Sequence, residues 1–196
     1  MSEAASPGEP IESPPLDSMR VCRTLSEHGV RYVLIGGVAL NLVGIPLVTL
    51  DVDICYEASQ TNTRALVRAL GALGAVPVDA DNRPLPAPID ARAMQLHDTF
   101  LFVTEAGRVD CLRIPDGTAG YDDLARTAIQ LDLDGVPVQV PAFQDMVRMK
   151  TAAGRPKDRI ALELLGALGD ALDGEPPIPY NPAELPEANP PRRSEQ

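Results

Sequence analysis

The chain of 196 residues contains few cysteines and no long apolar run. Its three cysteines, Cys22, Cys55 and Cys111, are an odd number and lack the paired spacing of a zinc site or a disulfide framework. We therefore interpret them as small buried apolar residues without a chemical role. No apolar run approaches membrane-spanning length, and no positively charged, apolar segment stands at the amino terminus. These absences lead us to expect one soluble, cytoplasmic domain with no membrane contact.

Basic residues are also scarce, since 17 lysines and arginines stand against 28 aspartates and glutamates. Much of this acidic excess lies in two proline-rich end segments, residues 1–18 and 173–196, which show no apolar periodicity. We predict that both segments are disordered tails around a single domain at residues 19–172. Because the domain itself is closer to neutral, the negative charge neither favours nor excludes a nucleic-acid partner.

Between the tails, helical and extended patterns alternate, which predicts an α/β (α+β) domain with a mixed β-sheet flanked by helices. Ser18 is a candidate N-cap of a first helix, and Gly29 is a candidate left-handed stop after it. Residues 77–90 hold four prolines and are predicted to form a surface loop. The predicted strands are 31–35, 49–54, 99–104, 108–114 and a hairpin at 131–138, and the predicted later helices are 38–43, 61–73, 143–153 and 157–168.

A glycine pair, Gly36 and Gly37, closes the first apolar strand and opens a short helix. Glycine has no side chain that would keep the backbone amides away from a phosphate, and the start of a helix favours an anion. A Gly-Gly after a strand is also a common turn. The pair is therefore a candidate phosphate site whose meaning depends on its surroundings.

Two aspartates follow on the next predicted strand, in the run Thr49 to Ile54. Side chains two apart on a strand share a face, so Asp51 and Asp53 should point to one side while Leu50, Val52 and Ile54 enter the core. Two such carboxylates repel each other unless a divalent cation lies between them. Asp51 and Asp53 are therefore candidate ligands of Mg²⁺ or Mn²⁺.

A third aspartate, Asp110, lies in the middle of a predicted strand between Val109 and Cys111 and shares its face with Arg108 and Leu112. Aspartate is unfavourable there for both strand propensity and burial, so the position favours a functional explanation. A second Asp-x-Asp, formed by Asp132 and Asp134, is different. It runs directly into an Asp-Gly turn and no glycine pair precedes it, so turn formation explains it better.

The combination of strand, Gly-Gly, short helix, strand and Asp-x-Asp resembles the polymerase-beta-like nucleotidyltransferase superfamily, and looks closest to small bacterial members that include the AbiEii-type toxins. The resemblance implies a minimal nucleotidyltransferase fold with a C-terminal helical pair. It also implies transfer of a nucleoside monophosphate from a nucleoside triphosphate to a hydroxyl, with two metal ions held by three carboxylates. On this pattern Asp110 matches the third ligand beside Asp51 and Asp53, and all three would be catalytic.

The junction of the last two predicted helices concentrates positive charge, because five of the seventeen basic residues lie between 148 and 159. Taken alone, this pattern is also typical of solvated helix ends. The AbiEii-like resemblance implies that Lys150 reaches the triphosphate, that Arg155 and Lys157 hold phosphate or the acceptor, and that Asp158 orients one of them. Related chains often carry an arginine near the position of Leu47, so one phosphate contact is absent from this sequence.

The sequence thus predicts a metal-dependent nucleotidyltransferase that acts on a hydroxyl of RNA or of a partner protein, with the toxin of a toxin-antitoxin pair as one form of this role. Its partners would be a nucleoside triphosphate, the acceptor and a cognate antitoxin. Two alternatives stay open. One is a non-catalytic nucleotide-binding or interaction protein that keeps the fold, and the other is a small-molecule transferase of the antibiotic-modifying kind.

Overall fold

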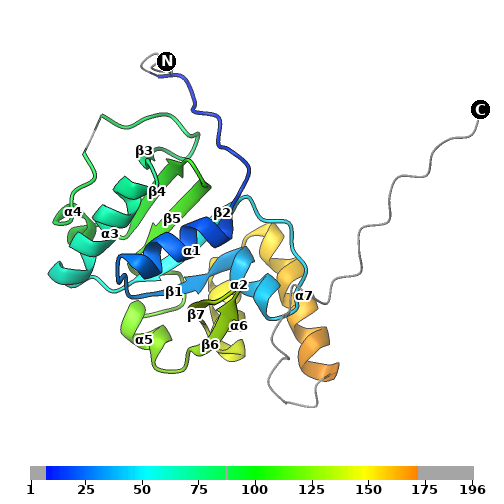
Figure 1. The fold of residues 1–196 in the computed structure, drawn as a ribbon. Coiled ribbons are helices and arrows are strands. Elements are labelled where there is room, and N and C mark those ends of the chain that lie inside the picture. Colours follow the sequence, from blue (N-terminus) through cyan, green and yellow to red (C-terminus); the bar gives the residue numbers. More distant parts are fainter. Residues whose placement is uncertain (1–7, 87, 172–196) are drawn as a thin grey trace, which may run out of the picture.

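The computed structural model describes residues 8–86 and 88–171, without the side chains of residues 157, 170 and 171 (Figure 1). Its centre is a five-stranded mixed sheet in the order β1-β2-β5-β4-β3, in which β2 and β5 are parallel and the other neighbours are antiparallel. The predicted mixed sheet is confirmed. The strands are β1 (Tyr32–Ile35), β2 (Asp51–Tyr56), β3 (Val76–Val78), β4 (Thr99–Thr104) and β5 (Gly107–Leu112).

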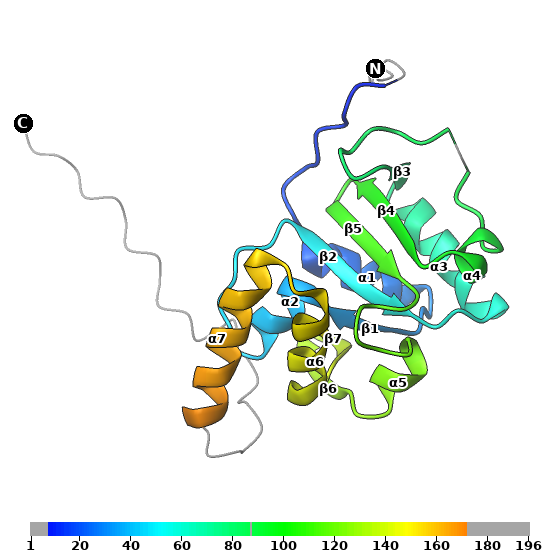
Figure 2. The same cartoon turned by 180° about the vertical axis from the view of Figure 1, so that it is seen from behind.

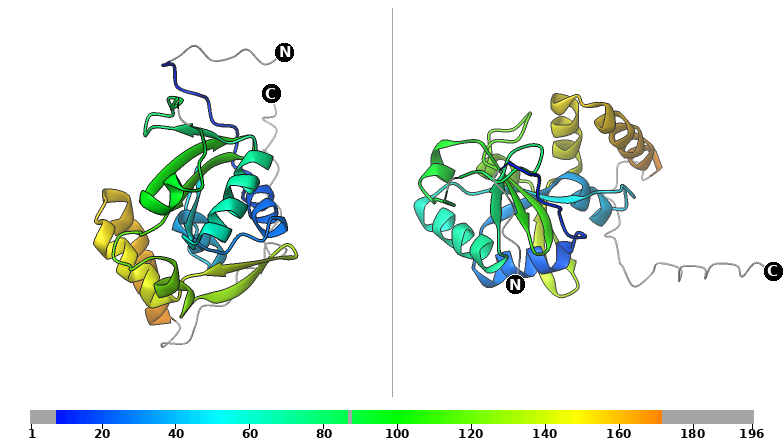
Figure 3. Two further views of the ribbon diagram at one scale, coloured as in Figure 1. Left: turned by 90° about the vertical axis from the view of Figure 1, so that its left-hand side faces the viewer. Right: turned by 90° about the horizontal axis from the view of Figure 1, so that it is seen from above.

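Helices flank this sheet, and α1 and α3 lie together over one of its faces (Figure 1). The C-terminal pair α6 and α7 lies on the opposite side of the molecule, as Figures 2 and 3 show. This arrangement agrees with the predicted flanking helices and C-terminal pair. The helices are α1 (Ser18–Glu27), α2 (Gly36–Leu42), α3 (Gln60–Ala72), α4 (Ala93–Leu96), α5 (Tyr121–Ala125), α6 (Phe143–Ala153) and α7 (Pro156–Ala171).

The two central strands alternate between a buried and a polar face. On β2, Val52 and Ile54 are fully buried in the main core with residues of α1 and α3, whereas Asp51 and Asp53 are only partly buried, and Cys55 on their face is buried in a second, smaller cluster. Strand β5 follows the same pattern, with Val109 and Cys111 in the core. Because successive side chains on a strand point to opposite faces, the polar residues of both strands lie on the face away from α1 and α3. This face carries the site described below.

The prediction that Leu50 enters the core is wrong. Leu50 is 78% exposed, because β2 begins at Asp51 and the preceding residue belongs to the connection from α2. The alternation that should have buried Leu50 therefore does not extend to it. Val48, two residues earlier in the same connection, is 97% exposed.

Two further local predictions need correction. The first helix is capped by Asp17 and not by Ser18, because the Asp17 carboxylate accepts the backbone N–H of Arg20 at 2.9 Å. The predicted loop at 77–90 overlaps a short strand, β3, which pairs with β4 despite Pro77. A proline is tolerated there because β3 is the edge strand of the sheet.

A separate two-stranded hairpin is formed by β6 (Ile129–Leu133) and β7 (Val136–Val140). Asp134 and Gly135 form its turn with positive φ angles of 48° and 82°, which confirms the predicted Asp-Gly turn. Within the part of the chain that the structure describes, no helix combines the length and apolar character needed to cross a bilayer.

Residues 8–17 run beside the sheet before α1 begins. The Ile11 N–H donates to the Asn82 carbonyl at 2.8 Å, and the Asp17 N–H donates to the Ala106 carbonyl at 2.9 Å. Leu16 packs against Gly107, where an added Cβ would lie 2.9 Å from the Leu16 Cα. Residues 1–7 and 172–196 lie outside the described part, and the predicted domain boundaries and tails stay predictions.

Candidate active site

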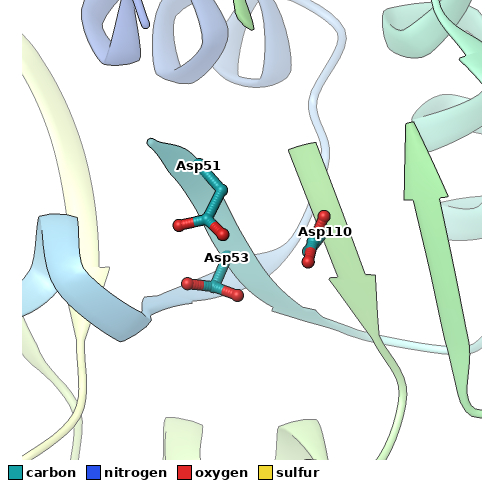
Figure 4. Close-up of side chains that lie close together, drawn as sticks. All are labelled: Asp51, Asp53 and Asp110. Atoms are coloured by element: carbon teal, nitrogen blue, oxygen red, sulfur yellow. The ribbon is translucent and has the colours of Figure 1, made fainter. Parts of the chain in front are cut away.

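Three carboxylates meet on the open face of the sheet. In the parallel pairing of β2 and β5, Asp53 lies opposite Asp110 and Asp51 lies opposite Arg108. One carboxylate oxygen of each of the three aspartates lies within 4.8 Å of the other two (Figure 4). Oxygen ligands at this spacing suit a hard divalent cation such as Mg²⁺ or Mn²⁺. The structure therefore brings together all three residues that the sequence selected as metal ligands.

The first glycine of the pair makes room for one of these carboxylates. Gly36 has φ +71°, and a Cβ built on it would lie 1.9 Å from Oδ2 of Asp53. Any other residue would combine a strained backbone with a direct collision. A glycine is thus required at position 36 to make room for Asp53. The predicted reason was different, namely the approach of a phosphate to the backbone amides.

The second glycine makes room for a neighbour of Asp51. A Cβ on Gly37 would lie 2.6 Å from Cβ and Oγ1 of Thr49. The Thr49 hydroxyl is also 2.9 Å from Oδ1 of Asp51, to which it donates a hydrogen bond. A side chain at Gly37 would therefore displace Thr49 and, through it, Asp51. The predicted contact of the Gly37 backbone with a phosphate stays a prediction.

A pocket of about 380 Å³ opens above the carboxylates. Its wall joins segments far apart in the sequence: the glycine pair, the α2–β2 connection, the faces of β2 and β5, and the α6–α7 junction. The residues with predicted roles that line it are Gly36, Gly37, Asp51, Asp53, Asp110, Lys150, Arg155 and Asp158. The basic junction and the carboxylate cluster thus face one cavity of the size typical for small ligands.

Lys150 and Asp158 form an ion pair in the wall of this pocket. The Lys150 Nζ lies 2.8 Å from Oδ1 of Asp158, with side-chain exposures of 21% and 2%. Burial alone would raise the pKa of Asp158, but the hydrogen bond and charge of Lys150 and the backbone N–H of Arg155 outweigh it and hold the pKa below its usual value. These two residues are therefore not solvated helix ends.

Arg155 occupies a more open position at the rim. Its side chain is 57% exposed, and Nη2 lies 3.7 Å from Oδ2 of Asp116, another residue of the pocket wall. This pair is weak, so the guanidinium can exchange partners at little cost. Lys157 lies in the first turn of α7, and its side chain is outside the described part of the structure, so its predicted role stays a prediction.

The sequence matches no protein-family model and no curated protein. Solved structures do match. The lincomycin-bound crystal structure of the lincosamide antibiotic adenylyltransferase LnuA superposes with a TM-score of 0.55 at 13% identity, over 79% of this chain and 99% of LnuA. The solution structure of the antibiotic-resistance factor ANT(2'')-Ia gives a TM-score of 0.52 at 13% identity, over 79% of this chain and 83% of that one.

The chain has a nucleotidyltransferase-like fold. At 13% identity the likeness concerns the fold, which agrees with the predicted polymerase-beta-like architecture. The more specific resemblance to AbiEii-type toxins has no support among these matches.

Within this nucleotidyltransferase-like fold, Arg108 is a site residue to which the sequence analysis gave no role. Its Nε donates to Oδ1 of Asp110 at 2.9 Å, and its Nη1 donates to Oδ1 of Asn82 at 2.7 Å. The signal for Arg108 was present, because it lies two residues before Asp110 on the same strand and therefore shares its face. Nothing in the sequence pattern pointed to Asn82, which lies far away in the chain.

The three cysteines are buried and unpaired in the nucleotidyltransferase-like fold. Burial raises the pKa of the Cys22 thiol to about 11 and that of Cys55 to about 12, and it raises the pKa of Cys111 well above its ordinary value. A thiol with a raised pKa is a poor nucleophile and a poor metal ligand at neutral pH. Their interpretation as small buried apolar residues agrees with this.

Proposed function

We propose that this protein is a metal-dependent nucleotidyltransferase that moves a nucleoside monophosphate from a nucleoside triphosphate to a hydroxyl group. The observation that carries the proposal is the convergence of Asp51, Asp53 and Asp110 within 4.8 Å, on the open face of a nucleotidyltransferase-like sheet. A protein with this fold that bound no divalent cation would have no need to keep three repelling carboxylates together.

The three aspartates would hold Mg²⁺ or Mn²⁺. A bound divalent cation supplies charge neutralisation at the phosphates and lowers the pKa of the attacking hydroxyl. The chain's own contribution is orientation. Thr49 fixes one oxygen of Asp51, Gly36 leaves space for Asp53, and the parallel register places Asp110 opposite Asp53. Positioning of this kind is the main demand of phosphoryl-type transfer.

The cationic side of the pocket would bind the triphosphate. The ion pair with Asp158 holds the positively charged Lys150 ammonium at the pocket wall. Arg155 lies at the rim, and its planar guanidinium suits hydrogen bonds to phosphate oxygens or to the acceptor. Asp158 also accepts the backbone N–H of Arg155 at 3.2 Å, so a single buried carboxylate contacts both residues. Lys157 and the backbone amides of Gly36 and Gly37 are further proposed phosphate contacts.

For the acceptor we propose a hydroxyl of RNA or of a partner protein, with an AbiEii-type toxin and its antitoxin as the biological setting. A second candidate is a small-molecule acceptor. It is favoured by the likeness to LnuA, whose structure is lincomycin-bound, and by the apolar side chains of Leu47 and Val48 in the pocket wall. A surface that binds RNA would instead be expected to carry basic residues at the positions of Leu47 and Val48.

The test is incubation of the purified protein with each radiolabelled nucleoside triphosphate, Mg²⁺ and three acceptor pools: total RNA, cell proteins and a panel of hydroxylated antibiotics. Transfer of label to one pool, absent with Asp53→Asn, would support the proposal and identify the acceptor class. Mg²⁺-dependent nucleotide binding without transfer to any pool would favour a non-catalytic nucleotide-binding protein. Equal nucleotide affinity with Mg²⁺ and with chelator would remove the metal-dependent mechanism.

A further inference from the structure

One metal-ligand candidate is held by a chain of contacts that leads away from the pocket. Asp110 accepts a hydrogen bond from Arg108, and Arg108 donates a second one to the side chain of Asn82. The side chains of Arg108 and Asp110 are 19% and 15% exposed, so this ion pair is much less open to solvent than a surface pair. Shielding of this kind makes both its charge interaction and its geometry matter more.

Asn82 is itself fixed by its backbone. It has φ +61°, a left-handed conformation that asparagine tolerates better than most residues. Its N–H donates to the Asp79 carbonyl at 3.1 Å, and its carbonyl accepts the Ile11 N–H at 2.8 Å. The Asp79 carboxylate closes the turn by accepting the N–H groups of Asp81 and Arg83, both at 2.9 Å. Contacts from the turn and from the amino-terminal segment therefore hold Asn82 in one place.

The sheet order places this support on the side opposite the other two carboxylates. Asn82 follows β3, which is separated from β5 by β4, whereas Asp51 and Asp53 belong to β2 on the other side of β5. Arg108 reaches from β5 toward the β3 side. Asp110 is thus bonded to an anchored guanidinium on one flank and faces its partner carboxylates on the other.

We propose that Asn82 is a positioning residue, which fixes the guanidinium of Arg108 and through it the carboxylate of Asp110 as third metal ligand. This inference rests on the proposed function, because it requires the aspartates to bind a cation. An arginine has many rotamers, and a guanidinium held at one end only would let Asp110 turn with it. Partners behind the direct ligands orient them and affect metal affinity substantially.

The test is titration with MnCl₂ in the absence of nucleotide, followed by calorimetry and by Mn²⁺ electron paramagnetic resonance. Asn82→Gly removes the side chain but keeps the left-handed backbone, so we expect an unchanged melting temperature and about tenfold weaker Mn²⁺ binding. Asn82→Asp keeps an acceptor for Arg108 and should bind Mn²⁺ nearly as well as the wild type. Asp134→Gly is the matched control, because Asp134 also has a positive φ and lies in the remote hairpin.

A double variant tests whether Asn82 acts through Arg108. Arg108→Lys keeps the charge but loses the two-point contact, and adding Asn82→Gly to it should weaken Mn²⁺ binding no further. Wild-type Mn²⁺ affinity in Asn82→Gly, or equal losses in Asn82→Gly and Asn82→Asp, would overturn the positioning role alone. Failure of the wild-type protein to bind Mn²⁺ more tightly than Asp53→Asn would overturn the metal site and the proposed function with it.

Discussion

The chain contains the Asp-x-Asp pattern twice, and the two copies have different structural surroundings. Asp51 and Asp53 lie on a central strand, where a parallel neighbour brings Asp110 against them. Asp132 and Asp134 lie at the turn of the β6–β7 hairpin, which forms a separate two-stranded sheet. There the Asp132 carboxylate accepts the Gly135 N–H at 2.8 Å, and Asp134 takes a left-handed turn conformation.

The difference shows that the neighbours of a motif decide its chemistry. The first pair begins its strand, faces a third carboxylate and lies against a glycine without a Cβ, so its oxygens converge on one point. In the second pair, the Asp132 carboxylate accepts a turn N–H, and the backbone of Asp134 forms the turn itself. Substitutions at matched positions in the two copies can therefore test the interpretation, from the largest expected effect to the smallest.

The largest effect should come from Asp53→Asn. Loss of one metal ligand should lower nucleotide transfer by about 10³-fold or more, because metal-assisted charge stabilisation is worth several kcal/mol. Asp132→Asn should leave transfer unchanged. Initial rates with a labelled triphosphate measure the effect, and melting curves in chelator check the fold. A large loss of stability in Asp53→Asn would mean that the first pair is structural as well, and equal losses of transfer in both variants would contradict the difference between the two pairs.

The next effect should come from Gly36→Ala, compared with Gly135→Ala in the hairpin turn. Both glycines have positive φ, so backbone strain in each alanine variant should lower the free energy of unfolding by about 1 to 2 kcal/mol. Only the Cβ at Gly36 would collide with Asp53, whereas nothing lies within 4 Å of the Cβ position at Gly135. Gly36→Ala should therefore also weaken Mn²⁺ binding. Intact Mn²⁺ affinity in Gly36→Ala would contradict the close fit of Gly36 and Asp53.

A third test separates the binding role of Lys150 from its structural role. Lys150→Met alone leaves the buried Asp158 without its ammonium partner and should lose about 1 to 3 kcal/mol of stability. Lys150→Met with Asp158→Asn removes both charges, so it should recover stability while nucleotide affinity stays about tenfold lower. Calorimetric titration with a non-hydrolysable triphosphate measures this. Recovery of nucleotide affinity in the double variant would show that Lys150 serves the ion pair alone.

The same pair gives a pH dependence of known sign. Because the folded-state pKa of Asp158 lies below its ordinary value, its stabilising contribution is fully present above about pH 4 and is lost as the pH falls through the lowered pKa. The stability difference between the wild type and Asp158→Asn should shrink over that acidic range in denaturant titrations. A difference that is constant from pH 6 to pH 2.5 would contradict the ion pair.

The smallest effect should come from Asp132→Ala. It removes one side-chain hydrogen bond to the Gly135 N–H at the hairpin turn and should lower the unfolding free energy by about 0.5 to 1.5 kcal/mol. Transfer and Mn²⁺ binding should not change. Urea unfolding of this variant beside Asp53→Asn completes the comparison. A loss of Mn²⁺ affinity here would place the second pair in the metal site and defeat the distinction.

The four longer strands of the central sheet, the hairpin and the three aspartates could be predicted because their signals are local, whereas the short strand β3 was missed behind Pro77. Period-two alternation places Asp51 and Asp53 on one face, the mid-strand position of Asp110 indicates a function, the nucleotidyltransferase resemblance implies its match to the third ligand, and the Asp-Gly turn identifies the hairpin. The contact of Asn82 with Arg108 could not be predicted, because it depends on the sheet order and on a turn 26 residues away in the chain. The collision that explains Gly36 likewise exists only once the chain has folded.

The position of β5 between β2 and β4 also determines the stage of synthesis and folding at which the three aspartates can come together. A nascent chain that has emerged only as far as β4 carries Asp51 and Asp53 but not Asp110. The candidate cation site would be complete only after β5 joins β2 in parallel, a pairing between residues far apart in the sequence, which are slow to pair in general. If the proposed function is right, cation binding would report completion of the sheet, and a chain that ends before β5 would lack the third carboxylate.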